Sequence, residues 1–283
     1  MTNIQKRLLV FLIGLPLLVG VVVLLAEPYH VGFNIIAIVA SAICTVEASL
    51  LIEKKQKGYR SEVLRAAAIG MLLPGVTWLV VIQALPPEAP VFTLITAISL
   101  IFATQVLRKN QEEFDKVVGH LTSLVTLLIY PGFFISFATR ITTLPRATEL
   151  LAAFFCIVFL NDSMAYASGM LFGRNSRKVL AVSPNKSLVG FAGGFLTSPL
   201  VVVFAEWLRP GLFPGGLTAR ILFGAAIGAT AILGDLVESA LKRGTLTKDS
   251  GQLIPGRGGL LDSADSVIFA APLFYYLYLF VFL

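Results

Sequence analysis

The sequence predicts an all-α, polytopic integral membrane protein. Of its 283 residues, 57% are hydrophobic and only 13% are charged, about half the charged fraction of a soluble domain. Apolar runs of roughly 20 residues, enough for a helix to cross a bilayer, recur along the whole chain. No uninterrupted polar stretch exceeds about 30 residues, so we expect no separate soluble domain.

Nine apolar runs meet this length, and we take each as one transmembrane helix. The first follows Lys6 and Arg7. Its apolar core exceeds the roughly 7–15 residues of a signal peptide and no small-residue cleavage pattern follows, so we expect an uncleaved span. The predicted spans are 7–26, 31–52, 66–85, 90–107, 117–138, 148–172, 188–208, 218–237 and 264–283.

The chain divides into two predicted regions. Residues 1–145 hold the first five spans, and residues 146–283 hold the last four. The second region also contains two polar loops, 173–187 and 238–263, which carry most of the candidate site residues. We therefore expect the second region to be catalytic.

The positions of the basic residues predict the orientation. Of the 22 Lys and Arg, 18 lie in the N-terminus or in even-numbered loops. The positive-inside rule then places the N-terminus and both polar loops in the cytoplasm and the C-terminus outside. This loop bias also accounts for the net charge of +6, so we expect no nucleic-acid partner.

Ionisable residues inside spans are costly and are functional hypotheses by default. For Glu47, alone in its span, we favour a helix-to-helix hydrogen bond. For Glu206, beside Arg209 at the outer end of its span, we favour an interfacial ion pair. The acids concerned are Glu47, Asp162, Glu206 and Asp235.

Asp162 has a different setting from the other acids. Asn161 and Ser163 flank it in the middle of an apolar run. Tyr166 follows four residues later, on the same helical side. Three adjacent polar residues at this depth predict a polar cavity.

Asp235 begins a polar segment that continues to Asp265. Glu238, Ser239 and Lys242 follow Asp235 at +3, +4 and +7, so all four project from one face of a continuing helix. The remainder of the segment is rich in charged residues and glycine: Arg243, Lys248, Asp249, Gly256, Arg257, Gly258, Gly259, Asp262 and Asp265.

This composition indicates a metal–phosphate site. Mg²⁺ favours one or two carboxylates together with water and phosphate oxygens. Lys and Arg offset phosphate charge, and glycines allow backbone N–H groups to approach phosphate closely. No Walker A, dinucleotide-binding or HExxH motif is present, and His30 and His120 lie far from the segment. We therefore do not expect histidine acid–base catalysis.

Four motifs in the C-terminal third carry a family resemblance. They are Ser239-Ala-Leu-Lys242-Arg243, Lys248-Asp249-Ser250-Gly251, Pro255-Gly256-Arg257-Gly258-Gly259 and Asp262-Ser263-Ala264-Asp265. With Gly234-Asp235 and an upstream block from Asn161 to Gly194, they resemble the phosphatidate cytidylyltransferases, also called CDP-diacylglycerol synthases. The resemblance is specific over about residues 158–271 and architectural before that.

Three positions depart from the pattern of this family. Arg257 stands where the family has His, Ser263 where it has Arg, and Val189 where it usually has an acid. We interpret Arg257 as supplying the positive charge that is absent at Ser263.

The resemblance implies transfer of a cytidylyl group from CTP to phosphatidic acid, with release of pyrophosphate, in phospholipid biosynthesis. It implies a bacterial inner-membrane location, surrounded by bilayer lipid, with the active site facing the cytoplasm. It implies bound Mg²⁺, and it leaves open a second, monovalent cation and a homodimer.

The resemblance also assigns roles to residues. The predicted Mg²⁺ ligands are Asp235, Asp262 and Asp265. The predicted catalytic residues are Asp235, Lys242, Arg243, Lys248 and Asp249. The predicted substrate-binding residues are Asn161, Asp162, Tyr166, Ser183, Lys186, Ser187, Ser239, Gly256, Arg257, Gly258 and Gly259.

Two other functions fit parts of the sequence. A CTP-dependent polyprenol or phytol kinase would transfer the γ-phosphoryl group to a lipid alcohol. An ion-coupled transporter would use Asp162 and Asp235 within the membrane, but such folds often contain inverted repeats, and the sequence shows none.

Overall fold

The computed structural model describes residues 3–24, 26, 28–55, 61–109, 111–173, 180–184, 186–254 and 258–283. Within these ranges the regular structure is helical, and extended pairing is limited to isolated bridges. The prediction of an all-α protein is therefore confirmed.

The described helices account for all nine predicted spans, although not all are long enough to cross a membrane. In chain order they are α1 (Asn3–Leu24), α2 (Val31–Lys55), α3 (Val63–Val81), α4 (Ala89–Gln105), α5 (Gln111–Phe114), α6 (Val117–Leu127), the π-helical segment η1 (Leu128–Phe133), α7 (Phe134–Ile141), α8 (Ala147–Phe172), α9 (Leu188–Leu208), α10 (Leu217–Gly244) and α11 (Leu261–Phe282).

Seven helices in the described ranges are long and apolar enough to cross a membrane, counting Val117–Ile141 as one. The chain is thus a polytopic helical membrane protein. The other two predicted spans correspond to α1 and to α4, which has 17 residues. Since neither is among the seven, the count of nine crossings stays a prediction.

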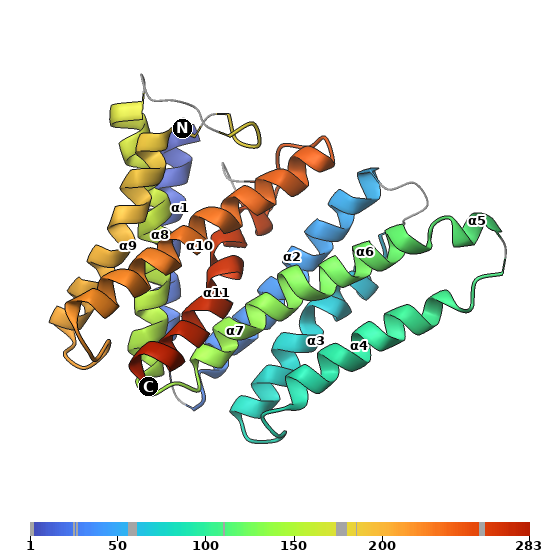
Figure 1. Cartoon of the computed structure of the whole chain (residues 1–283), viewed down its shortest axis with the longest axis horizontal. Helices are drawn as coiled ribbons and strands as arrows, with labels where there is room; N and C mark the ends of the chain where they lie inside the picture. Colours follow the sequence, from blue (N-terminus) through green and yellow to red (C-terminus); the bar gives the residue numbers. More distant parts are fainter. Residues whose placement is uncertain are drawn as a thin grey trace.

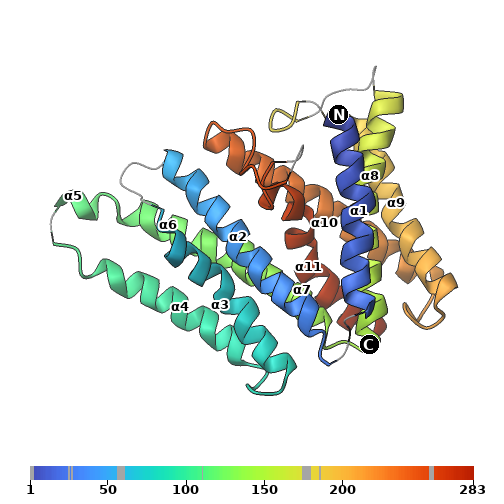
Figure 2. The same ribbon diagram turned by 180° about the vertical axis from the view of Figure 1, so that it is seen from behind.

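The long helices run in alternating directions, which brings the two polar loops to one edge of the molecule. Figure 1 shows the start of α1, the ends of α2, α8 and α10 and the starts of α9 and α11 towards the same edge, opposite the C-terminus. Figure 2 shows α1 lying along α8, with α2, α3 and α4 on the other side of α10 and α11. We call the shared edge the polar end.

Aromatic packing fixes α10 and α11 against α8. The ring of Phe274 on α11 lies 5.0 Å from that of Phe154 on α8 and 5.3 Å from that of Phe223 on α10. The Tyr278 hydroxyl donates a hydrogen bond to the Leu212 carbonyl at 2.9 Å. This core holds together the three helices that carry Asp162, Asp235 and Asp265.

Glycines bring these helices into backbone contact. A Cβ atom at Gly234 of α10 would lie 2.6 Å from the Asp265 carbonyl oxygen on α11, and one at Gly190 of α9 would lie 2.8 Å from the Ala165 carbonyl oxygen on α8. Small residues allow this close approach between membrane helices. As a result, Asp235 is placed directly beside the first turns of α11.

Helix α2 is fixed to α3 by a hydrogen bond to a carbonyl group of α3 that has lost its helical donor to a proline. Pro74 in α3 lacks an N–H group, so the Gly70 carbonyl four residues earlier loses its helical donor. The Ser41 hydroxyl of α2 donates to that carbonyl at 2.6 Å and lies 3.2 Å from the Pro131 carbonyl in η1. These contacts position α2, which carries Glu47.

Candidate active site

The polar end gathers charged residues from loops six and eight and from the helices beside them. We call the chain between α8 and α9 loop six and that between α10 and α11 loop eight. Loop eight is shorter than predicted, because α10 continues to Gly244 and α11 already begins at Leu261. Hydropathy underestimates the length of these two helices because their ends at loop eight are polar. Asp235, Glu238, Ser239 and Lys242 lie on the one helix predicted for them.

Lys242 lies between two carboxylates. Its ammonium pairs with Glu238, one turn earlier on α10, and with Asp262 of α11 at 2.6 Å. The Glu238 side chain is fully buried, those of Asp262 and Lys242 are 5% and 15% exposed, and neither Glu238 oxygen accepts a directed hydrogen bond from the described residues. Because a buried charge requires a partner, Lys242 is the ammonium that compensates both acids.

Asp262 also organises loop eight. Its Oδ2 atom accepts hydrogen bonds from the Ser250 N–H at 2.8 Å, the Ser250 hydroxyl at 2.9 Å and the Gly259 N–H at 2.7 Å. Gly258 has a φ of +111°, which disfavours any side chain, and it bridges to Ile254 through two backbone hydrogen bonds. Both Asp262 oxygens are thus occupied by protein donors.

Glu47 of α2 reaches the same loop from the other side. Its Oε1 atom accepts from the Leu260 N–H at 3.0 Å, and Oε2 accepts from the Leu261 N–H at 2.8 Å. The Ser250 hydroxyl lies 3.2 Å from Oε2. The expected helix-to-helix bond is therefore confirmed, but the predicted site did not include Glu47. No local sequence signal connects residues more than 200 positions apart.

Lys186 joins loop six to α10. Its ammonium forms an ion pair with Asp235. Its backbone N–H closes a turn by donating to the Ser183 carbonyl at 3.1 Å. The next residue, Ser187, caps α9 by accepting a hydrogen bond from the Gly190 N–H at 3.1 Å. The structure thus brings two of the predicted segments into direct contact.

Several carboxylates surround Lys186. Burial lowers the pKa of its ammonium, and the charges of Asp265 and Asp162 oppose that shift. Asp265 is buried and accepts a hydrogen bond from the Ser266 N–H at 2.6 Å, while the Ser266 hydroxyl lies 3.4 Å from Asp162. Asp162 thus lies near polar groups of α11 and loop six, while the polar cavity expected around it stays a prediction.

Asn161, which precedes Asp162 in the sequence, lies at the contact between α8, α9 and α10. It is fully buried, and its amide nitrogen lies within hydrogen-bond distance of the Gly194 carbonyl (3.1 Å), the Ser198 hydroxyl (2.9 Å) and the Gly228 carbonyl (3.3 Å). These contacts tie α8 to α9 and α10. Substrate binding by Asn161 stays a prediction, while its structural contacts are shown.

The remaining predicted residues lie around this cluster. Arg243 is exposed, and its Nε atom donates to the Val182 carbonyl of loop six at 3.4 Å. Lys248 and Asp249 are exposed on loop eight, and Ser239 is half-buried on α10. Tyr166, on α8, is 45% exposed. The other two, Gly256 and Arg257, lie outside the described residues. The proposal that Arg257 supplies the positive charge absent at Ser263 therefore stays a prediction.

The predicted magnesium ligands are not gathered into one set. In the described ranges no three His, Cys, Asp or Glu side chains are close enough to hold a metal ion together. Asp262 is engaged by Lys242 and loop eight, and Asp235 by Lys186. Carboxylates have the donor chemistry that Mg²⁺ prefers, so this assignment stays a prediction.

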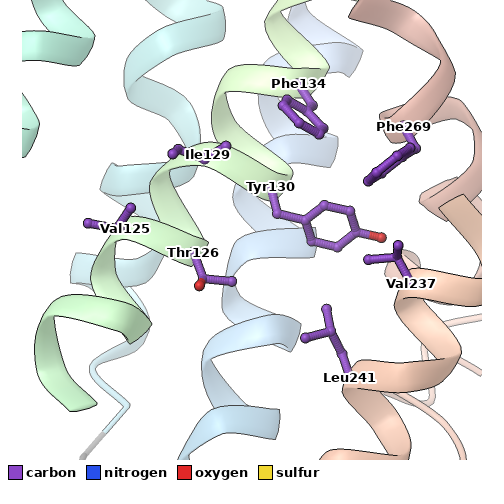
Figure 3. A pocket seen from close by; sticks show the side chains of 8 residues that line it. All are labelled: Val125, Thr126, Ile129, Tyr130, Phe134, Val237, Leu241 and Phe269. Carbon is purple, nitrogen blue, oxygen red and sulfur yellow. The ribbon is translucent and has the colours of Figure 1, made fainter. Parts of the chain in front are cut away.

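An apolar cavity of about 290 Å³ lies next to the charged cluster. Figure 3 shows Tyr130 reaching across it from the α6–α7 helix towards Val237 and Phe269. Val237 and Leu241 precede Glu238 and Lys242 on α10, so the cavity adjoins the polar groups. It is lined by Val125, Thr126, Ile129, Tyr130, Phe134, Val237, Leu241 and Phe269.

Comparison with known proteins identifies the family. The model of the cytidylyltransferase family matches residues 5–281, so the chain belongs to this family. The match includes the N-terminal spans, where the motifs alone indicated only a similar architecture.

Three bacterial relatives are each named phosphatidate cytidylyltransferase. That of Haemophilus influenzae is 44% identical over 47% of this chain and 46% of its own length. That of Synechocystis sp. is 43% identical over 44% and 41%, and that of Bacillus subtilis is 35% identical over 64% and 65%. The chain thus spans about half to two thirds of the length of these relatives.

Proposed function

We propose that this protein transfers the cytidylyl group of CTP to phosphatidic acid, forming CDP-diacylglycerol and pyrophosphate. The observation that carries the proposal is the joining of loops six and eight at the polar end, with Lys186 held at Asp235 and Lys242 held at Asp262. Membership of the cytidylyltransferase family and the names of the relatives support it.

The reaction demands charge compensation more than proton transfer. A phosphate oxygen of phosphatidic acid attacks the α-phosphorus of CTP and forms the new P–O bond. The bond from the α-phosphorus to the oxygen bridging to the β-phosphorus breaks, and pyrophosphate leaves with the electron pair. The attacking group is already anionic, so no strong base is needed. Lys186, Lys242, Arg243 and Lys248 would offset the charge of the two substrates and the leaving group.

Bound Mg²⁺ is part of this proposal. The Lys186 ammonium is paired with Asp235, and the charges of Asp265 and Asp162 also act on it, so a cation near this position would meet negative charge. Mg²⁺ would supply positive charge to phosphate oxygens. Asp235 and Asp265 would hold it, and Asp262 would join them once Lys242 turns to a phosphate. The family resemblance leaves a monovalent cation and a homodimer open.

The lipid substrate and the location follow from the same arrangement. The apolar cavity beside Glu238 and Lys242 suits an acyl chain whose phosphate reaches the lysine. Most Lys and Arg lie on the side of loops six and eight, and the relatives are bacterial. We therefore propose the inner membrane, with the polar end in the cytoplasm.

One assay tests the reaction type and the nucleotide. Purified protein in lipid–detergent micelles receives Mg²⁺, phosphatidic acid and CTP, dCTP or ATP, and both pyrophosphate and CDP-lipid are measured. We expect equal amounts of both products from CTP. In a parallel reaction with polyprenol or phytol in place of phosphatidic acid, release of CDP with the phosphorylated alcohol would instead show the kinase. Absence of pyrophosphate together with ion flux in liposomes would show a transporter.

A further inference from the structure

We propose that Glu47 is a positioning residue of the active site. From α2, in the N-terminal half of the chain, its carboxylate holds Ser250 of loop eight and the start of α11 in register for Lys242 and Asp262. The inference rests on the proposed function for its effect on turnover, while its structural part can be tested separately.

The geometry shows that Glu47 contacts both the interior of loop eight and the start of α11. Its two oxygens accept the N–H groups of Leu260, the N-cap residue of α11, and of Leu261, its first residue, and neither N–H has an intrahelical partner. The hydroxyl of Ser250, ten residues before Leu260, lies 3.2 Å from the same carboxylate. Glu47 is buried, with an exposed fraction of 7%. A buried carboxylate at a helix N-terminus is a favourable arrangement.

Glu47 and Asp262 share one hydroxyl group. The Ser250 hydroxyl lies 2.9 Å from Asp262 Oδ2 and 3.2 Å from Glu47 Oε2. One hydroxyl proton serves one of these acceptors at a time. The position of Asp262, and therefore of the Lys242 ammonium bound to it, depends on where Glu47 holds Ser250 and the start of α11.

The glycines of the motifs have a second explanation in this contact. A Cβ atom at Gly251 would lie 2.6 Å from Glu47 Oε1, and one at Gly259 would overlap Glu47 Oε2 and the Ser250 hydroxyl. The sequence predicts that the glycines of 256–259 allow the backbone to approach phosphate closely. In the structure, the backbone at Gly251 and Gly259 passes directly over the Glu47 carboxylate.

The test compares Glu47→Gln with Glu206→Gln. Glu206 also accepts two backbone N–H groups, from Gly211 and Phe213, but at the opposite end of the bundle. In Glu47→Gln one oxygen becomes an N–H₂ donor that faces other donors. We expect kcat to fall about 10–100-fold, with the KM for CTP changed less than threefold. We expect Glu206→Gln to retain the wild-type kcat.

Hydrogen–deuterium exchange gives a readout independent of turnover. Exchange of peptides covering 258–265 should be faster in Glu47→Gln than in the wild type or in Glu206→Gln. Glu47→Asp retains the charge with a shorter reach, so its kcat should lie between those of the wild type and Glu47→Ala. If Glu47→Gln does not fold, this Asp-to-Ala comparison and the exchange of Ser250→Ala take its place.

The outcomes separate the two proposals. If the wild type makes no CDP-lipid, the proposed function fails, while exchange at 258–265 still decides whether Glu47 fixes the loop. If the wild type is active and Glu47→Gln matches Glu206→Gln in both kcat and exchange, Glu47 is not a positioning residue.

Discussion

Replacing Lys242 by methionine removes the cation that compensates two acids. Methionine keeps an unbranched side chain, one atom shorter, but leaves Glu238, which is fully buried, and Asp262, which is 5% exposed, without the ammonium. Breaking a buried ion pair from one side costs about 3–5 kcal/mol. Asp262 keeps three N–H or O–H donors, so we expect most of this loss to arise at Glu238.

A double variant separates stability from catalysis. In Lys242→Met with Glu238→Gln, the uncompensated charge at position 238 is gone. We expect it to recover about 2 kcal/mol of the free energy of unfolding, since a neutral amide is less costly to bury than a charge. Turnover should stay about 10²–10³-fold below wild type, because the contact that we propose between Lys242 and a substrate phosphate is still missing.

The assay is unfolding by SDS titration in detergent micelles, together with CDP-diacylglycerol formation. Arg220→Met is the matched control, because Arg220 pairs with Glu206 at 3.0 Å far from the polar end and Glu206 keeps two backbone donors. We expect a smaller stability loss there and normal turnover. If the Lys242/Glu238 double variant regains turnover along with stability, Lys242 only neutralises Glu238 and our phosphate assignment is wrong.

Four further experiments test other parts of the structure. Asn161→Leu should lower the free energy of unfolding by about 2–4 kcal/mol, because it removes the buried hydrogen bonds that tie α8 to α9 and α10; unchanged stability with weaker CTP binding would instead make Asn161 a substrate ligand. Gly234→Ala should reduce turnover more than tenfold by pushing α11 from α10, whereas Gly244→Ala, with open space at its Cβ position, should not. Val237→Trp should raise the KM for phosphatidic acid about tenfold, equivalent to about 1.4 kcal/mol, and leave that for CTP unchanged; Leu233→Trp, outside the cavity, is the control. With Cys44 and Cys156 replaced by alanine, an impermeant maleimide should label Lys248→Cys from the cytoplasmic side and Arg209→Cys from the other, and labelling from the same side would contradict the predicted orientation.

Periodicity and charge predicted the framework of the site. The +3, +4 and +7 spacing after Asp235 placed Glu238, Ser239 and Lys242 on one helix, which α10 confirms. Counting Lys and Arg placed loops six and eight on one side of the membrane, and the two loops are found at the same edge of the bundle (Figure 1). Both predictions depend on local spacing or on the parity of the spans, which a sequence displays directly.

The partners of individual side chains could not be predicted in this way. Asp262 was expected to bind a metal. In the structure it accepts hydrogen bonds from the Lys242 ammonium and from the backbone N–H groups of Ser250 and Gly259. Asn161 was expected at the nucleotide, and it ties three helices together. Which faces of distant helices meet depends on packing, and spacing within one helix carries no information about it.

The ion pairs at the polar end have a consequence for substrate binding. Lys186 and Lys242 are already engaged by carboxylates, so a phosphate can take either lysine only if the carboxylate left behind finds another cation. A divalent ion held at Asp235 and Asp265 would replace Lys186 in this way, and Lys242 would become free for phosphate only if Asp262 also joined the ion. Linkage then requires that the nucleotide and the cation each strengthen the binding of the other. Under the proposed function, the pairing therefore favours binding of the two polyanionic substrates together with the metal.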